Sequence, residues 1–151
     1  PRHACIAMTS TTAAPAPWPA AELERVFALP DATAIVHALE ASDSAWARDT
    51  AAALRQRSPL MLHVVLAFIR RARGLSLADD LRLERDLVRR CFHVRPGPAS
   101  DTVEGIRALA IDKDHQPKWH PARVEDVTPA DVDAYFAPPW PPHAHPLRAL
   151  G

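Results

Sequence analysis

The chain has 151 residues, with 18 Lys or Arg balanced by 18 Asp or Glu, so its formal net charge is zero. This balance gives no reason to expect a nucleic acid or an anionic membrane as a partner. The longest apolar run, residues 60–69, is far shorter than the roughly 20 residues that span a bilayer. We find no basic-then-apolar leader and no metal or redox spacing of the two cysteines, and we therefore expect a cytoplasmic protein with free thiols.

Prolines divide the chain into three parts. Residues 1–20 are rich in Pro, Ala and Thr and lack hydrophobic periodicity, so we expect an extended linker. Residues 21–137 carry the periodic apolar pattern and are expected to form the helical region. Residues 138–151 begin with Pro-Pro-Trp-Pro-Pro and are expected to be an extended tail like the first segment.

Helix start signals recur through the first half of the helical region. A short amphipathic turn over residues 22–27 is followed by Asp31, the predicted N-cap of the next helix. Either Asp43 or Ser44 is expected to cap the third helix, which should bury Trp46, Ala53 and Leu54. Ser58-Pro59 then starts a fourth helix, because proline at the first helical position loses no hydrogen bond.

The helix after Ser58 is apolar on nearly all faces, so we expect it to be buried on most sides. Its polar exception, His63, is interpreted as a core-edge imidazole bonded to the backbone. Three cations lie at its C-terminal end, namely Arg70, Arg71 and Arg73. They complement the helix dipole there, and a contact with phosphate is the alternative interpretation. Gly74 is the predicted left-handed residue that ends the helix.

Ser76 and Asp79 have the spacing of a capping box and open a long helix. The residues expected on its inner face are Leu77, Leu81, Val88, Cys91 and Phe92. Asp86 and Arg90 stand four residues apart in the favourable order for an ion pair. Thr128-Pro129 is expected to start a last short helix. Because no segment shows the two-residue alternation of a strand, the sequence predicts an all-α fold.

The segment from residue 101 to residue 119 is the most informative. Asp101-Thr102 supplies N-cap chemistry, and apolar residues recur at helical spacing until Asp112-Lys113-Asp114. A proline then fixes the backbone just before Lys118 and Trp119. A cation beside an indole suits a nucleotide-like ligand, while packing of Trp119 into the fold is the alternative. The candidate ligand-binding residues are Lys113, Lys118 and Trp119.

Other chemical constellations are weak. With four glycines the chain has no nucleotide-binding fingerprint, and no serine occupies a nucleophile elbow. His143 and His145 have metal-ligand spacing but no neighbouring carboxylate or thiol, so we expect no metal site. His115, His120 and Glu84 are interpreted as exposed residues. From these patterns we predict no catalytic residue and no bound cofactor in this chain.

Several motifs resemble the C-terminal helical region of the crotonase superfamily, which includes the enoyl-CoA hydratases and isomerases. They are Ser58-Pro59, Gly74 to Asp80 and Glu104 to Leu109. The continuation resembles the 3-hydroxyisobutyryl-CoA hydrolase branch more specifically. It comprises Ile111 to Asp114, Pro117 to Trp119, Pro121, Val127-Thr128 and Asp131 to Phe136. The resemblance covers roughly residues 20–138, which is most of the chain.

This resemblance implies hydrolysis of an acyl-CoA thioester, by an oxyanion hole and a carboxylate, in valine degradation. In such proteins an N-terminal α/β spiral core carries these groups, and no segment here resembles it. We therefore expect a C-terminal part that is inactive alone and that needs this core, in its own chain or in a partner chain. Coenzyme A is then part of the substrate, with its adenine end near Lys113, Lys118 and Trp119.

Two other functions stay open, as does self-association into a homo-oligomer. One is an enoyl-CoA hydratase/isomerase, which would use the same thioester pocket for a reaction at a C=C bond. The other is a non-catalytic helical module or remnant, which the missing oxyanion segment favours for the residues in hand.

Overall fold

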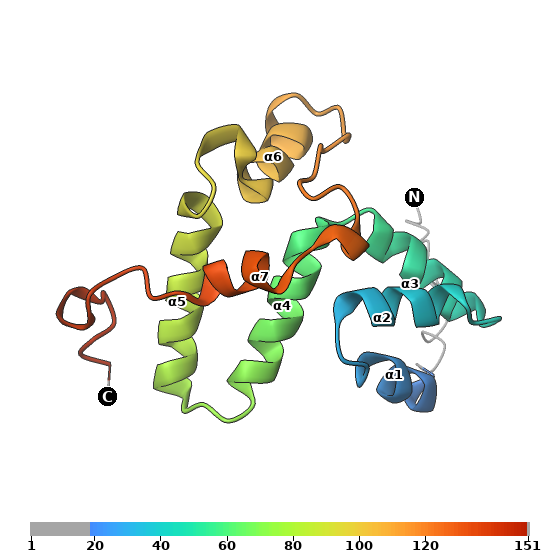
Figure 1. Ribbon diagram of the computed structural model, residues 1–151, viewed down its shortest axis with the longest axis horizontal. Helices are drawn as coiled ribbons and strands as arrows, with labels where there is room; N and C mark the ends of the chain where they lie inside the picture. The colour runs from blue at the N-terminus through green and yellow to red at the C-terminus, as the bar shows by residue number, and fades with distance from the viewer. Residues whose placement is uncertain (1–18, 151) are drawn as a thin grey trace, which may run out of the picture.

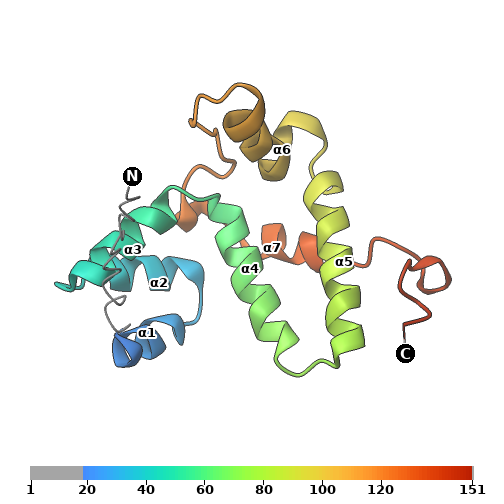
Figure 2. The same cartoon turned by 180° about the vertical axis from the view of Figure 1, so that it is seen from behind.

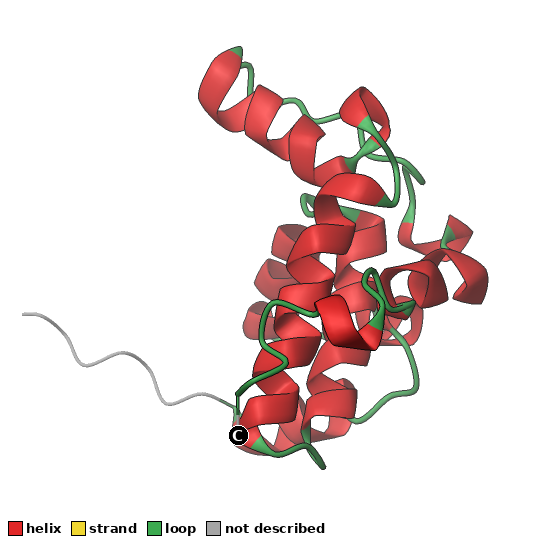
Figure 3. Ribbon diagram, turned by 90° about the vertical axis from the view of Figure 1, so that its left-hand side faces the viewer, coloured by secondary structure: helices red, strands yellow, loops and turns green. Residues whose placement is uncertain are grey.

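The computed structural model describes residues 19–150, and all regular structure in that range is helical (Figures 1 and 3). The all-α prediction is confirmed for these residues. The α-helices are α1 (Ala20–Phe27), α2 (Ala32–Glu40), α3 (Ala45–Arg55), α4 (Pro59–Ala72), α5 (Leu77–His93), α6 (Asp101–Ile106) and α7 (Pro129–Phe136). The shorter helical turns are η1 (Gly97–Ala99), η2 (Arg107–Ile111), η3 (Val124–Asp126) and η4 (Pro142–Ala144). Of the predicted linker, everything before Pro19 lies outside the described residues.

Polar side chains begin most of the helices, as predicted. The N-caps of α2, α3, α4, α5 and α7 are Asp31, Ser44, Ser58, Ser76 and Thr128. Each side chain accepts a hydrogen bond from a backbone N–H in the first turn, for example Ala34 to Asp31 at 2.8 Å. At Ser76 the box is incomplete, since the Asp79 carboxylate accepts from the serine hydroxyl at 2.8 Å.

Apolar side chains form three small clusters, and α4 contributes to each. The cluster of α1, α2 and α3 contains buried Val26, Ile35, Leu39, Ala47 and Ala51. The cluster of α4, α5 and α7 contains Leu60, Val64, Leu87 and Tyr135. The third cluster joins α2, α4 and η3 through Ala32, Val36 and Val124. Figures 1 and 2 show the corresponding layout, with α1–α3 on one side of α4 and α5 and α7 on the other.

The predicted burial of α4 and α5 is only partly correct. Leu77 is 75% exposed and Val88 47% exposed, whereas Leu87 is buried and Cys91 half-buried. Leu81 and Phe92 are likewise exposed. The reason is that α7 and α6 each contact only part of α5, and the positions of Leu77 and Val88 are left open. The outer face of α4 is open in the same way, and within α3 the buried residues are Ala47 and Ala51 rather than Ala53.

Two predicted details at helix ends are wrong. Gly74 is not left-handed, because the turn after α4 closes with ordinary dihedrals and a bond from Leu75 N–H to Ala72 O at 3.0 Å. Asp86 and Arg90 do not pair either. Asp86 lies 3.1 Å from His145 Nε2, and Arg90 donates to two backbone carbonyls after α7. Those partners come from residues that follow α7 in the chain.

The tail after α7 lies against α5 instead of extending away from it (Figure 1). The indole of Trp140 lies 5.2 Å from the guanidinium of Arg85 and 5.0 Å from that of Arg89. Arg82 donates to the carbonyl of Leu147 at 3.1 Å. Cation–π contacts and these hydrogen bonds therefore hold the proline-rich segment to the helix.

Candidate functional site

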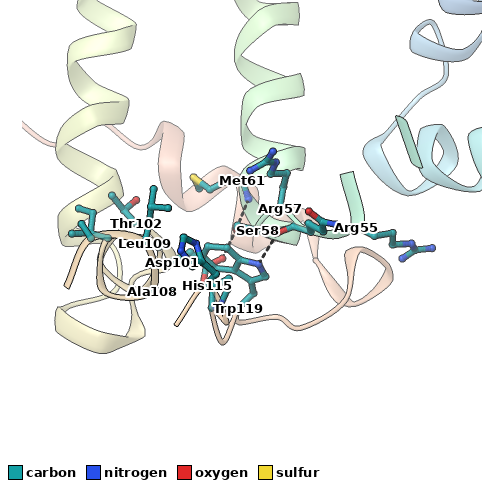
Figure 4. A pocket seen from close by; sticks show the side chains of 15 residues that line it. Arg55, Arg57, Ser58, Met61, Asp101, Thr102, Ala108, Leu109, His115 and Trp119 are labelled. Atoms are coloured by element: carbon teal, nitrogen blue, oxygen red, sulfur yellow. Dashed lines mark hydrogen bonds between the residues drawn. The ribbon is translucent and has the colours of Figure 1, made fainter. Parts of the chain in front are cut away.

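A cavity of about 740 Å³ lies between the start of α4 and the segment 101–119 (Figure 4). Its wall is mostly apolar. The lining residues used below are Arg57, Asp101, Gly105, Leu109, His115 and Trp119. A concave, largely apolar hollow with a few polar groups is the usual form of a small-molecule site.

Trp119 both packs on the fold and lines the cavity. Its Nε1 donates to the carbonyl of Gln56 at 3.4 Å. The edge of its ring lies over Gly105 of α6, so close that a Cβ at that position would be 3.2 Å from Cη2. The two interpretations of this residue from the sequence are thus compatible, because one part of the indole is covered and another faces the cavity.

The start of α6 differs from the prediction by one residue. Ser100, rather than Asp101 or Thr102, is the N-cap, with its hydroxyl accepting the Val103 N–H at 3.4 Å and donating to the Cys91 carbonyl at 2.7 Å. The Asp101 carboxylate is therefore not used as a cap. It is buried, and it accepts the His120 N–H at 3.0 Å and the hydroxyl of Ser58.

Glu104 of the same helix belongs to an ion-pair network whose centre is Arg107 of η2. Its carboxylate accepts from Arg107 at 2.8 Å and from the backbone N–H of Lys118 at 2.7 Å. Hydrogen bonds from Arg107 first, and then from Lys118 N–H, lower the pKa of Glu104 to about 2. Arg107 also pairs with Asp112 and Asp114, each at 2.7 Å.

This network holds an unusual turn after η2. Lys113 and His115 have φ values of 56° and 55°, in the left-handed region that costs a non-glycine residue energy. The carboxylates on both sides of Lys113 are tied to the single guanidinium of Arg107. Arg107 therefore holds residues 112–116 through ion pairs with two carboxylates of the same segment.

The structure separates the three candidate residues. Of Lys113, Lys118 and Trp119, only Trp119 lines the cavity, while both lysines are exposed and lie close to its lining residues in sequence only. Within residues 19–150 neither lysine ammonium forms an ion pair. The main chain of Lys118, by contrast, is fixed to Glu104.

Arg57 is a cavity residue that the sequence analysis missed. It lines the cavity, and its guanidinium makes no hydrogen bond or ion pair with any other residue of the described range. Arg55, two residues earlier, is committed to Glu40 at 2.7 Å and to Glu125 at 2.8 Å. The sequence offered one indication of this role, namely the position of Arg57. It directly precedes the Ser58-Pro59 helix start and so lies at the corner between α3 and α4.

The remaining polar candidates have structural partners. His63 Nε2 lies 3.2 Å from the carbonyl of Val124, which confirms its interpretation as a core-edge imidazole. Arg70 donates to the carbonyls of Leu29 and Pro30, a role that neither the dipole nor the phosphate interpretation included. His115, His120 and Glu84 are exposed, as predicted.

Within residues 19–150, no three His, Cys, Asp or Glu side chains come together in a way that could hold a metal ion. No helix in the same range is both long enough and apolar enough to cross a bilayer.

Comparison with known proteins identifies the family. The sequence model described as enoyl-CoA hydratase/isomerase matches residues 3–136, and this chain therefore belongs to the enoyl-CoA hydratase/isomerase family. It is 39% identical over 119 residues to 3-hydroxyisobutyryl-CoA hydrolase 1 of Arabidopsis thaliana, covering 76% of this chain and 31% of that protein. Matches to further hydrolases of this description confirm the predicted resemblance to the 3-hydroxyisobutyryl-CoA hydrolase branch.

Two other relatives extend the comparison. Small ribosomal subunit protein mS47 of Arabidopsis thaliana is 36% identical over 120 residues, which are 77% of this chain and 29% of that protein. The crystal structure of an enoyl-CoA hydratase from Rhodobacter sphaeroides is 36% identical, with a TM-score of 0.70 over 80% of this chain and 34% of that one. The chain thus spans about a third of the length of the proteins it matches.

Proposed function

We propose that this chain forms the helical region of an acyl-CoA thioester hydrolase of the 3-hydroxyisobutyryl-CoA hydrolase type, and that its cavity contacts the coenzyme A part of the substrate. The observation that carries the proposal is the presence of an indole face and a guanidinium, those of Trp119 and Arg57, in one cavity. An indole stacks on adenine, and a guanidinium binds phosphate through paired N–H donors. Every coenzyme A thioester contains both an adenine ring and phosphate groups.

The two lysines fit the edge of such a site. Lys113 and Lys118 are exposed and close in sequence to residues that line the cavity, with ammonium groups that have no carboxylate partner in the described part of the chain. An exposed ammonium attracts phosphate at longer range without fixing its geometry. We assign direct contact to Arg57 and Trp119, and electrostatic attraction to the lysines.

The proposal gives this chain binding groups and no catalytic group. The Asp101 carboxylate, which lines the cavity, already accepts hydrogen bonds from Ser58 and His120, and Glu104 beside it is bound to Arg107. Carboxylate oxygens that already accept several hydrogen bonds are not free to take up a proton or to attack an acyl carbon. We therefore place the oxyanion hole and the reacting carboxylate in a core outside the matched third of the relatives. A cytoplasmic location and a role in valine degradation stay predictions.

Isothermal titration of coenzyme A into the 151-residue chain tests the binding role. Trp119→Ala and Arg57→Ala should each weaken binding about tenfold, since stacking and charge-assisted contacts are each worth roughly 1–3 kcal/mol. Trp140→Ala and Arg73→Ala are matched controls outside the cavity and should bind like the parent. Equal affinity of all four variants would overturn the assignment.

The catalytic part of the proposal is tested by thiol release. Thioesterase assays on the chain alone should show no free coenzyme A from 3-hydroxyisobutyryl-CoA, and release of the thiol would show that the chain contains its own catalytic groups. In an intact relative with this segment, free coenzyme A from a saturated hydroxyacyl thioester supports the hydrolase. Conversion of an enoyl thioester without thiol release supports the hydratase/isomerase alternative.

A non-catalytic helical module is the second candidate, and one observation favours it. The similarity to small ribosomal subunit protein mS47 extends over 77% of this chain. A structural module of this kind would have no need of a coenzyme A site. Absence of coenzyme A binding by the parent chain in the same titration would therefore favour this candidate.

A further inference from the structure

Two buried carboxylates of α6 hold the backbone on both sides of Trp119. Asp101 and Glu104 are three residues apart, which places them on one face of the helix. Asp101 accepts the N–H of His120 at 3.0 Å, and Glu104 accepts the N–H of Lys118 at 2.7 Å. Because both neighbours are fixed to the same helix, the backbone that carries the indole has little freedom to rotate.

Each carboxylate is itself held from its other side. Asp101 is 4% exposed and receives the hydroxyl of Ser58 at the start of α4. Glu104 is 7% exposed and receives two N–H groups of Arg107, at 2.8 and 2.9 Å. Buried carboxylates are costly unless they are paired and hydrogen-bonded, and here both are. Figure 4 shows Ser58, Asp101 and Trp119 gathered where α4 begins.

Gly105 provides the surface on which the ring lies. A glycine within a helix is less favourable than alanine, so helix formation does not account for it. Its missing side chain does account for the position of the ring. An added Cβ would lie 3.2 Å from Cη2 and 3.6 Å from Cζ3 of Trp119, and the ring cannot retreat easily while residues 118 and 120 are held.

We propose that Asp101, Glu104 and Gly105 are positioning residues that fix the indole of Trp119 as a preformed wall of the cavity. An adenine-bearing ligand then meets an aromatic face that needs no ordering on binding, which favours affinity. This inference rests on the proposed coenzyme A contact. The position of the indole is nevertheless measurable without any ligand, so the two ideas are tested separately.

The ligand-free test uses the full chain with Trp18, Trp46 and Trp140 replaced by phenylalanine, which leaves Trp119 as the fluorophore. Gly105→Ala should shift its emission to longer wavelength and raise its quenching by acrylamide. Gly74→Ala is the matched control, because nothing lies within 4 Å of a Cβ there, and it should change neither. Unchanged emission and quenching in Gly105→Ala would overturn the proposal.

The carboxylates are tested in the same background. Glu104→Ala should raise quenching, and Glu104→Gln, which keeps an acceptor oxygen for Lys118 N–H, should restore most of the protection. Far-ultraviolet circular dichroism shows whether each variant keeps its helices. If Glu104→Ala unfolds, Asp101→Ala provides the measurement, since it removes the acceptor of the His120 N–H; it should raise quenching more than Glu104→Gln does, and no rise in Asp101→Ala would contradict the proposal.

Coenzyme A titration of these variants separates the inference from the proposed function. Loss of affinity in Gly105→Ala together with higher quenching supports both. A fixed indole in a parent chain that binds no coenzyme A overturns the proposed function, and with it the ligand role of the positioning residues. Higher quenching in Gly105→Ala with unchanged affinity would show that Gly105 positions the indole but that the indole does not contribute to binding, which overturns the assigned contact of Trp119 with coenzyme A.

Discussion

Replacement of Ser58 by alanine measures how strongly α4 is tied to α6. The Ser58 hydroxyl accepts the Met61 N–H at 3.1 Å and donates to Asp101, at positions that are 7% and 4% exposed. Loss of the N-cap costs about 1 kcal/mol. A buried carboxylate deprived of one donor costs roughly 1–3 kcal/mol more. Ser58→Ala should therefore lower the free energy of unfolding by about 2–4 kcal/mol.

Ser44→Ala is the matched control for this measurement. Ser44 caps α3 by accepting the Ala47 N–H at 3.4 Å, and its hydroxyl has no carboxylate partner. Its loss should cost only about 1 kcal/mol in urea unfolding followed by circular dichroism, with the same dependence on urea. The double variant Ser58→Ala/Asp101→Ala should cost less than the sum of the single changes. Equal losses in Ser58→Ala and Ser44→Ala would refute the coupling.

Three further outcomes are expected. Leu60→Ala, at a fully buried position, should lower the free energy of unfolding in urea by about 2–5 kcal/mol. Leu77→Ala, at a position that is 75% exposed, should leave the urea midpoint nearly unchanged. Equal losses in the two variants would contradict the assigned burial. Arg107 holds the pKa of Glu104 at about 2, below its ordinary 4.5. The resulting gain in the free energy of unfolding is complete above pH 4.5, the pKa of the unfolded state, and is lost as the pH falls toward 2. In Glu104→Gln the free energy of unfolding should therefore change less between pH 4.5 and pH 2 than in the parent chain. Trp140→Ala should release the tail from α5 and speed its proteolysis, and an unchanged cleavage pattern would argue against the contact.

Helix starts were predictable because their signal is local. A residue such as Asp31 or Thr128 satisfies an N–H three residues away, so the sequence alone contains both partners. The displaced start of α6 shows the limit of this reasoning. Asp101 is a good cap in isolation, but Ser58, far away in sequence, and His120 compete for its carboxylate.

Burial and the path of the tail were harder to predict, because they depend on which helices become neighbours. The α5 pattern is amphipathic, yet only the part around Leu87 and Cys91 packs into an apolar cluster, while Leu77 and Val88 stay exposed. The tail looked extended from its prolines, whereas Trp140 finds Arg85 and Arg89 one helical turn apart on α5. Proline content restricts local conformation and says little about such tertiary contacts.

The candidate site was predictable in its aromatic part alone. Trp119 stood out because a cation and an indole follow a proline. The roles of Glu104 and Gly105 depend on a chain reversal that brings residues 118 and 119 back to α6. The spacing of residues along the sequence does not predict this reversal. Arg57 carries no motif, and its importance follows only from the absence of a carboxylate partner within residues 19–150.

All three apolar clusters include residues of α4, and this determines how many helices lose packing when a core side chain is shortened. A cavity made at Ala47 or Ala51 of α3 touches the first cluster alone, although Leu54 of the same helix also borders the third. A cavity made on the inner side of α4 reaches α2, α5, α7 and η3 at once, because the clusters have no other common member. Apolar packing between the first and the second cluster therefore passes through a single helix, because α4 is the one element of the described residues that contributes to both.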